Sequence, residues 1–338
     1  MPTAADTMFQ VPVVRRYLEA VRAQHRYIDA RGVMQVVRDV KLAIDDAFVT
    51  MRLQIEKPTD RLERVPMMGA DDPVLREMEV SWPGNPAHRR QDRGRPAGPP
   101  TIAADVLLRH GARWFVLGDP GGGKTTLLRQ MAFRAADNAL RPEPQSPHLP
   151  LFIALRHLGA EWERHPEWSS SDAVFNYLAG AGLDDLIEVN EAERAAWCLA
   201  LQTALRHASV LLLCDGLDEQ RDAQARQRSS QAIEELLLRH AAPRVPCLIT
   251  SRAVGFDSGP LRSSFEVARL QPFDEDETKD FFQRWMLAVE LADDPQSQRI
   301  AAARAQRRTQ QLLDQMRSNS GVMTLASNPL MCAVIGLI

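Results

Sequence analysis

One segment of the sequence combines residue types and spacing that suit the binding of a phosphate group. Residues 118–125 read Gly-Asp-Pro-Gly-Gly-Gly-Lys-Thr, which fits the pattern G-x-x-x-x-G-K-[ST] without a gap. Glycines allow backbone N–H groups to converge on phosphate oxygens, and the start of a following helix adds its partial positive charge. Lys124 would then reach the β- and γ-phosphates of a nucleotide, and the hydroxyl of Thr125 would bind Mg²⁺. The predicted phosphate-binding residues are Gly118, Asp119, Pro120, Gly121, Gly122, Gly123, Lys124, Thr125 and Thr126.

The lysine at position 124 stands out in a chain that prefers arginine. Only four of the 41 basic residues are lysines, at positions 41, 57, 124 and 279. The compact ammonium of lysine fits inside a phosphate loop, whereas the planar guanidinium of arginine does not. The composition therefore favours a phosphate-binding role for Lys124 over a glycine-rich turn without a ligand.

A second candidate site lies at the end of an apolar run. Residues 210–214 read Val-Leu-Leu-Leu-Cys and are followed by Asp215, which is the form of a Walker B strand. A strand this apolar is buried on both faces, and its carboxyl end opens onto the ligand crevice of a parallel sheet. We expect Asp215 to hold Mg²⁺ there, directly or through water.

Two further carboxylates, Asp218 and Glu219, follow within one turn. Gly216 occupies the position at which many ATPases place a catalytic glutamate, so the residue that orients the attacking water is expected to be Asp218 or Glu219. We favour Glu219, because Asp218 can instead complete the magnesium shell. The alternative is a buried strand followed by a solvated acidic turn, and the phosphate loop makes that interpretation the weaker one.

These residues need a sheet to position them, and the chain after residue 100 has the pattern of one. Apolar strands alternate there with longer helical stretches, which predicts an α/β P-loop NTPase fold with a parallel sheet flanked by helices. Because one strand falls between the two motifs, we expect it to be inserted between them, unlike the adjacent pairing of small nucleotide kinases and GTPases. The expected strands are 114–117, 149–155, 210–214, 246–250 and 265–270, and the expected helices are 124–137, 172–180, 191–207 and 225–241.

The segments around this sheet predict three further parts of the chain. Residues 1–80 show a helical pattern and then a strand pattern, and are predicted to form a small mixed module. Residues 81–100 are rich in proline, glycine and arginine, so a solvated linker is favoured over a nucleic-acid patch. The NTPase domain is assigned to 101–272, and a helical domain to 273–338.

The predicted helical domain has a recognisable beginning. Asp274 and Glu277 have the spacing of a capping box, with aspartate in place of the more usual serine or threonine. Phe281, Phe282 and Trp285 then form an apolar face at helical spacing.

Composition excludes several classes of protein. The 338 residues carry a net charge of −3, which argues against a dedicated nucleic-acid binder. Four cysteines without CxxC spacing fit neither a zinc site nor a disulfide framework and suggest the reducing cytoplasm. There is no signal-peptide pattern at the start and no apolar run of about 20 residues, so no membrane association is expected. The apolar end, 330–338, reads as a buried helix cut short, so we expect the sequence to be a fragment of a longer chain.

Together these motifs resemble the NACHT family of signal-transduction NTPases, in the STAND class that includes animal inflammasome receptors and bacterial anti-phage proteins. Residues 213–219, Leu-Cys-Asp-Gly-Leu-Asp-Glu, place a small residue after the first aspartate and then an acidic pair, as that family does. The phosphate loop continues with Thr125-Thr126-Leu127-Leu128, similar to bacterial members. The resemblance spans roughly 101–338, and residues 1–80 more weakly resemble a module that precedes some bacterial NACHT domains.

The resemblance implies two more site residues. Arg252 ends Ile249-Thr250-Ser251-Arg252, which looks like the family's sensor segment, where an arginine approaches the γ-phosphate. Pro329 lies in Ser327-Asn328-Pro329-Leu330, which resembles the segment whose proline packs against adenine. From the residues alone, Arg252 would be a surface residue and Pro329 a helix-start proline behind a Ser or Asn cap. The family's winged-helix domain and C-terminal ligand sensor have no counterpart here, which fits a chain that stops early.

The resemblance implies a switch. ATP binds with Mg²⁺ and is hydrolysed slowly, and the ATP or ADP state controls opening and homo-oligomerisation in response to a trigger ligand that the sequence does not identify. The implied setting is bacterial anti-phage defence in the cytoplasm. ATP is favoured over GTP because no guanine-reading NKxD motif occurs, and the lack of LSGGQ weighs against a transporter.

Two other functions remain open from the sequence. The first is a motor-type AAA+-like ATPase that remodels nucleic acid or protein; Gly216 weighs against it, because many motors carry glutamate there. The second is a nucleotide-binding scaffold that never hydrolyses its ligand.

Overall fold

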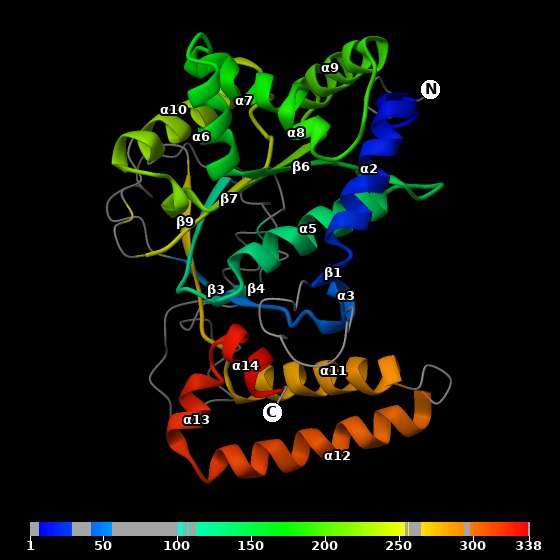
Figure 1. Ribbon diagram of the computed structural model, residues 1–338, viewed down its shortest axis with the longest axis vertical. Coiled ribbons are helices and arrows are strands. Elements are labelled where there is room, and N and C mark those ends of the chain that lie inside the picture. The colour runs from blue at the N-terminus through cyan, green and yellow to red at the C-terminus, as the bar shows by residue number, and fades with distance from the viewer. Residues whose placement is uncertain are drawn as a thin grey trace, which may run out of the picture.

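A computed structural model shows a central sheet surrounded by helices, with a layer of helices beneath its lower edge (Figure 1). The structure describes residues 7–28, 42–55, 101–103, 107, 113–253, 256, 265–293 and 298–336. The predicted linker at 81–100 lies outside the described residues.

The sheet contains all five strands that the sequence predicts, and the predicted fold class is confirmed. They are β5 (Arg113–Leu117), β6 (Leu149–Ala154), β7 (Val210–Asp215), β8 (Cys247–Ser251) and β9 (Glu266–Leu270). All five run parallel, in the spatial order β9-β5-β8-β7-β6. Every residue of β8 and the first five of β7 are buried, as expected for strands covered on both faces.

The order of the strands differs from the sequence prediction in one respect. The strand between β5 and β7 is β8, whereas β6 lies at the edge of the sheet. The two motif strands are separated by one strand, as expected, but that strand is β8 and not the 149–155 strand that the sequence interval suggested. An apolar run shows that a strand is buried, but it does not identify the strand's neighbours.

Two further strands from the chain before β5 extend the same sheet. Strand β3 (Arg52–Ile55) pairs antiparallel with β9, and β4 (Thr101–Ala103) pairs antiparallel with β3, which gives a sheet of seven strands within the described ranges. Helix α3 (Ile44–Ala47) precedes β3, and a short ribbon pairs β1 (Tyr27–Ile28) with β2 (Leu42–Ala43). A helix followed by a strand is the order predicted for residues 1–80, and the domain boundaries themselves stay a prediction.

Helix α2 (Pro12–His25) joins the N-terminal segment to the body of the protein. It begins with Pro12 in the first turn, and its apolar face packs against the helix that follows β5. The Tyr17 hydroxyl on that face donates a hydrogen bond to the Pro150 carbonyl at 2.9 Å. Tyr17 also packs against Trp197, with ring centroids 4.5 Å apart.

The described part of the chain contains six helices interspersed among the parallel strands. They are α5 (Lys124–Ala139), α6 (Leu155–Arg164), α7 (Ser170–Ala179), α8 (Ala181–Asp184), α9 (Glu191–Arg206) and α10 (Ala223–Arg239). Four match predicted helices to within about two residues at each end, a usual uncertainty for boundaries. Helix α6 was not predicted, because its charged residues and glycine hide the apolar face of Leu155, Leu158 and Trp162.

The chain leaves the sheet at β9, and its described residues form four more helices, the helical layer of Figure 1. They are α11 (Glu275–Asp293), α12 (Gln298–Arg317), α13 (Ser320–Leu325) and α14 (Pro329–Ile335). The predicted capping box is present: the Asp274 N–H donates to Glu277 at 2.9 Å, and the Glu277 N–H donates to Asp274 at 2.9 Å.

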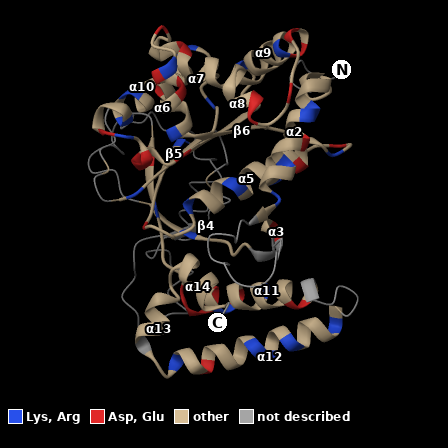
Figure 2. Cartoon of the chain, in the orientation of Figure 1, with Lys and Arg blue, Asp and Glu red and all other residues tan. Residues whose placement is uncertain are grey.

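The long helices α11 and α12 pack side by side. Arginines are spaced along α12 (Figure 2), and two of them pair with a carboxylate of α11. Arg308 lies 2.7 Å and Arg304 3.8 Å from the carboxylate of Glu290, a buried residue of α11. These pairs offset the cost of burying that charge.

The buried His25 at the end of α2 makes stability depend on pH. Burial, with a smaller contribution from Arg129, lowers the pKa of His25 from 6.5 to about 4. Between these values the unfolded chain binds a proton that the folded chain does not. The stabilisation is therefore complete above pH 6.5 and is lost as the pH falls towards 4, by about 3 kcal/mol in total.

Denaturant titrations of the parent and of His25→Leu at about pH 7.5 and about pH 4.5 measure this contribution. Subtracting the two proteins removes the effect of other titrating groups. We expect the stability of the parent relative to the variant to be lower at the acidic pH. A difference that does not change with pH would contradict the assignment.

Candidate nucleotide site

The predicted phosphate loop connects β5 to α5. Gly121 and Gly123 have φ angles of +74° and +90°, a backbone region that suits glycine. The Gly122 N–H donates to the Asp119 carbonyl at 3.0 Å, and Gly123 is the N-cap of α5. The loop thus turns tightly and ends where the first N–H groups of a 16-residue helix point outward.

Lys124 folds over this loop. Its ammonium donates to the carbonyls of Gly118 and Asp119, at 2.7 and 3.0 Å. Burial lowers the pKa of Lys124, and the nearby Asp218 carboxylate acts in the opposite direction. A cation held at the loop by carbonyl groups is well placed to meet an anionic ligand.

The first turn of α5 and the ends of β7 and β8 meet through three side chains. The Thr125 hydroxyl donates to Oδ2 of Asp215 at 2.8 Å, and the Thr250 hydroxyl donates to Oδ1 at 2.6 Å. The Thr250 oxygen also accepts the Gly216 N–H at 2.9 Å. Thr250, fully buried at the end of β8, therefore orients Asp215.

Thr125 and Asp215 fit a magnesium ion chemically. Both offer oxygen ligands, and Mg²⁺ bound with a nucleotide usually takes one or two protein ligands besides phosphate and water. Within the part of the chain that the structure describes, no group of three His, Cys, Asp or Glu residues could hold a metal by itself. The adjacent phosphate loop would have to supply the remaining partners by holding the nucleotide.

Beyond β7 the chain turns sharply and separates the two candidate bases. Gly216 has a φ of +77°, and a short 3₁₀ turn, η3 (Leu217–Glu219), follows it. Asp218 is held by Arg252, whose Nε lies 2.9 Å from Oδ2 and whose backbone N–H donates to Oδ1 at 3.0 Å. Glu219 has a different partner, Arg156, at 2.7 Å.

These groups line one cavity of about 340 Å³, a size that suits a small ligand. Its polar side contains most of the predicted residues: Pro120, Gly121, Gly122, Gly123, Lys124, Thr125, Thr126, Asp215, Asp218, Glu219 and Arg252. Its apolar side comes from the N-terminal segment and the helical layer: Phe48, Val49, Met51, Phe273, Phe281, Trp285, Pro329, Leu330 and Ala333. The phosphates of a nucleotide need a polar surface and its base needs an apolar one, and this cavity offers both.

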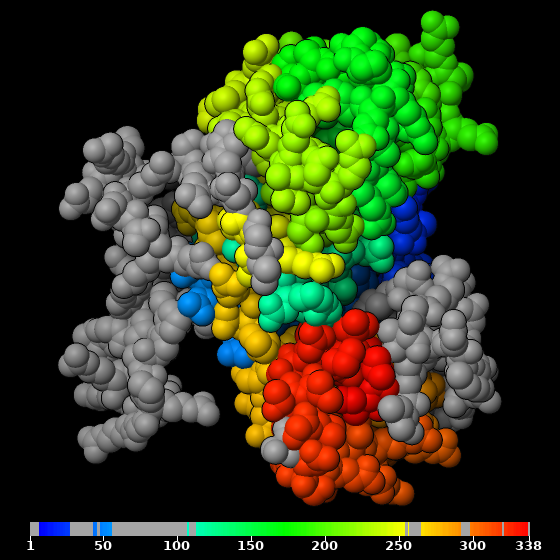
Figure 3. Space-filling model, turned by 60° about the vertical axis from the view of Figure 1, so that its left-hand side comes forward, coloured from blue at the N-terminus to red at the C-terminus, as the bar shows by residue number. Residues whose placement is uncertain are grey.

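The start of α14 rests on the phosphate loop. The Asn328 side-chain amide donates to the Pro120 carbonyl at 3.0 Å, and the Leu330 N–H donates to the Gly121 carbonyl at 3.2 Å. A Cβ at Gly121 would lie 2.9 Å from both Asn328 and Leu330, so this approach requires glycine. Figure 3 shows the red segment of α14 against the blue-green residues of the loop and α5.

Comparison with protein families decides which P-loop proteins these features belong to. The model of the NACHT domain matches residues 112–288, more than half of the chain. The chain belongs to the NACHT family. A search of curated proteins finds no match. Membership places the chain in the STAND class of nucleotide-binding P-loop NTPases, as the motifs predict.

The NACHT match covers the phosphate loop, the acidic turn and Arg252, but not the whole wall of the cavity. Pro329 and Leu330 lie after it, and Phe48 and Met51 lie before it. Gly118 and Asp119 do not line the cavity, and their carbonyls accept hydrogen bonds from the Lys124 ammonium. Among the described helices, none has the length and apolarity to cross a bilayer.

Sequence reasoning missed Thr250 and the N-terminal wall of the NACHT nucleotide site. A small polar residue at the end of an apolar strand was the available signal for Thr250. Met51 carried no comparable signal, because an alternating pattern predicts a strand and not the loop that it contacts.

Proposed function

We propose that this NACHT NTPase is an ATP-dependent switch, which binds ATP with Mg²⁺, hydrolyses it slowly and changes its assembly with nucleotide state. The single observation that carries the proposal is the contact between α14 and the phosphate loop. Because Asn328 and Leu330 bond to Pro120 and Gly121, a ligand in the loop acts directly on the helical layer. A ligand shifts a conformational equilibrium only through such differential contacts.

In this proposal, each residue of the polar wall has a defined task. Lys124 exchanges its loop carbonyls for the β- and γ-phosphates, while Thr125 and Asp215 hold Mg²⁺, which offsets phosphate charge when bound. Arg252 approaches the γ-phosphate from the end of β8, and Glu219 orients the attacking water. Pro329 packs against adenine on the apolar wall.

We infer a role in bacterial anti-phage signalling, with homo-oligomerisation on activation by a trigger ligand of unknown chemistry. The four cysteines are free in the structure, which suits a reducing cytoplasm.

The experiment that tests this function compares the chain loaded with Mg·ADP and with a non-hydrolysable Mg·ATP analogue. Hydrogen exchange reports on the turn before α14, and light scattering reports the mass in solution. We expect the two nucleotides to differ in both. Identical exchange and identical mass in the two states would contradict the switch.

A further inference from the structure

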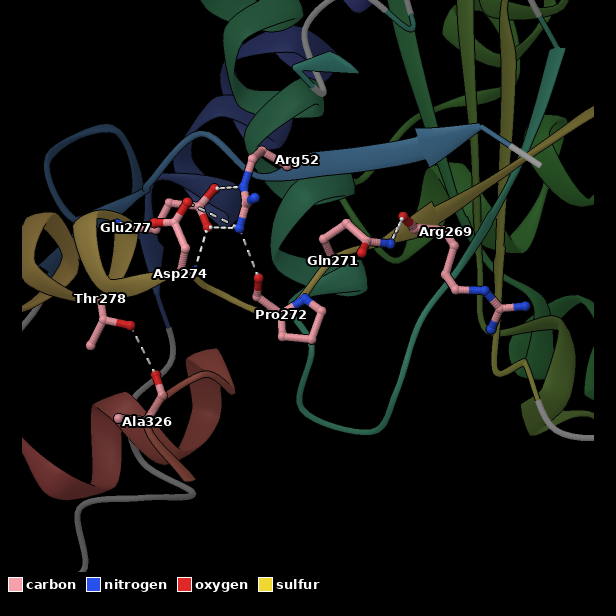
Figure 4. Close-up of polar contacts among 8 residues, drawn as sticks. All are labelled: Arg52, Arg269, Gln271, Pro272, Asp274, Glu277, Thr278 and Ala326. Atoms are coloured by element: carbon pink, nitrogen blue, oxygen red, sulfur yellow. Dashed lines mark hydrogen bonds and ion pairs between the residues drawn. The ribbon is translucent and has the colours of Figure 1, made fainter. Parts of the chain in front are cut away.

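Arg52, the first residue of β3, reaches from the N-terminal strand to the first turn of α11 (Figure 4). Its Nε donates to Oε1 of Glu277 at 2.9 Å, and its Nη2 donates to Oε2 at 2.8 Å. Two parallel bonds from one guanidinium to one carboxylate form the strong, directional type of ion pair. The Glu277 side chain is only 13% exposed, so this pair is better shielded than an ordinary surface pair.

The same guanidinium gathers the peptide that joins the sheet to α11. Nη2 of Arg52 donates to the Pro272 carbonyl at 3.2 Å and lies 3.2 Å from Oδ2 of Asp274. The Gln271 N–H donates to the Arg52 carbonyl at 3.0 Å. One residue of β3 thus holds the segment 271–277, here called the joint, through both its backbone and its side chain.

The other side of the joint carries the residues that rest on the phosphate loop. The Phe273 N–H donates to the Ser327 carbonyl at 2.8 Å, and the Thr278 hydroxyl donates to the Ala326 carbonyl at 3.3 Å. Asn328 and Pro329 follow directly. When the joint is held in place, Pro329 and the rest of the cavity's apolar side are therefore held opposite the phosphate loop.

The residue before Arg52 touches the loop itself. The terminal methyl carbon of Met51 lies where a Cβ on Gly123 would clash with it, so the side chain covers this glycine. Met51, just before β3, and Arg52, its first residue, therefore contact the phosphate loop and the joint from neighbouring positions of the chain.

We propose that Arg52 is a positioning residue for the nucleotide: its fork on Glu277 holds the joint against β3, so that the apolar wall stands opposite the phosphate loop before the ligand binds. This inference rests on the proposed nucleotide site. Arg52 lies outside the NACHT match, which begins at residue 112. A pre-formed site binds more tightly because less of the binding energy is spent on ordering it.

The test is Arg52→Gln, with calorimetric titration of Mg·ADP and hydrogen exchange of the joint in the nucleotide-free chain. If the closed joint falls to a minor population, the apparent Kd rises about fivefold to tenfold, and exchange at 271–277 becomes faster. The matched control is Arg317→Gln. Arg317 also bonds to the first turn of α11, at Glu275, but from within the helical layer. Its removal should leave the Kd for Mg·ADP and the exchange at 271–277 at parent level.

A double-mutant cycle separates positioning from stability. Glu277→Gln preserves the capping box, since glutamine serves at that position, but removes the charge that the fork needs. Arg52→Gln should then add no further loss of affinity in the Glu277→Gln background. If Arg52→Gln lowers the nucleotide affinity equally in the parent and in the Glu277→Gln background, the ion pair with Glu277 is not the cause of the loss.

Other outcomes are equally decisive. Parent affinity in Arg52→Gln would overturn the positioning role, whether or not exchange at the joint changes. If Arg52→Gln does not fold, Arg52→Lys tests the same point: an ammonium cannot form the fork, so its Kd should lie above that of the parent, and a parent Kd would overturn the proposal. A parent chain that binds no Mg·ADP would overturn the proposed function itself, whereas unchanged exchange in a binding-competent chain would overturn only this inference.

Discussion

Replacing Lys124 with alanine is expected to weaken the binding of Mg·ATP by about 100-fold or more. The ammonium lies inside the loop and has carbonyl partners that phosphates would replace. Charge-assisted hydrogen bonds are worth roughly 1.5–3 kcal/mol each, and about 1.4 kcal/mol corresponds to a tenfold change in affinity. Titration calorimetry of the parent and Lys124→Ala measures the difference.

The matched control is Lys279→Ala, which removes the same charge from an exposed position on α11. It should bind Mg·ATP as the parent does. Parent affinity in Lys124→Ala would mean that the loop does not bind the phosphates.

Replacing Glu219 with glutamine is expected to slow hydrolysis by about 10²- to 10⁴-fold while nucleotide affinity is retained, the usual contribution of a general base. The geometry supports this choice over Asp218. Both oxygens of Asp218 are engaged by Arg252, through its backbone N–H and its Nε. The ion pair of Glu219 with Arg156 engages Oε2 and is exposed, with 40% of the Glu219 side chain accessible.

Single-turnover measurements with Mg·ATP on the parent, Glu219→Gln and Asp218→Asn assign the base. Asp218→Asn should alter affinity for the nucleotide, because its partner Arg252 is then unpaired in the cavity. If both variants hydrolyse ATP at the parent rate, neither residue is the base. If Asp218→Asn alone abolishes hydrolysis with affinity intact, the base is Asp218.

The sequence predicted the parts of the site that depend on local pattern. Strands such as β7 and β8 are nearly continuous apolar runs because both of their faces are covered, so a single window of sequence identifies them. The loop from Gly118 to Thr125 is equally local, since its spacing is set by the turn and the helix that follows. Asn328 caps α14 through bonds to the Leu330 and Met331 N–H groups, as a cap before proline predicts.

The sequence could not predict contacts between distant segments. Asn328 also donates to Pro120, 208 positions away, and no periodicity relates the two. Arg52 and Glu277 are 225 positions apart, and each read alone is an ordinary charged residue of a strand or a helix. The place of β8 between β5 and β7 was missed for the same reason, since hydrophobicity records burial and not neighbours.

Hydrogen exchange of residues 118–126 and 326–335, in the nucleotide-free, Mg·ADP and Mg·ATP-analogue states, tests the central claim most directly. Our account predicts that nucleotide protects the loop, and that exchange around Asn328 differs between ADP and the ATP analogue, because α14 bonds to the loop that holds the phosphates. Protection confined to the loop, with identical exchange at 326–335 in both nucleotide states, would contradict the account.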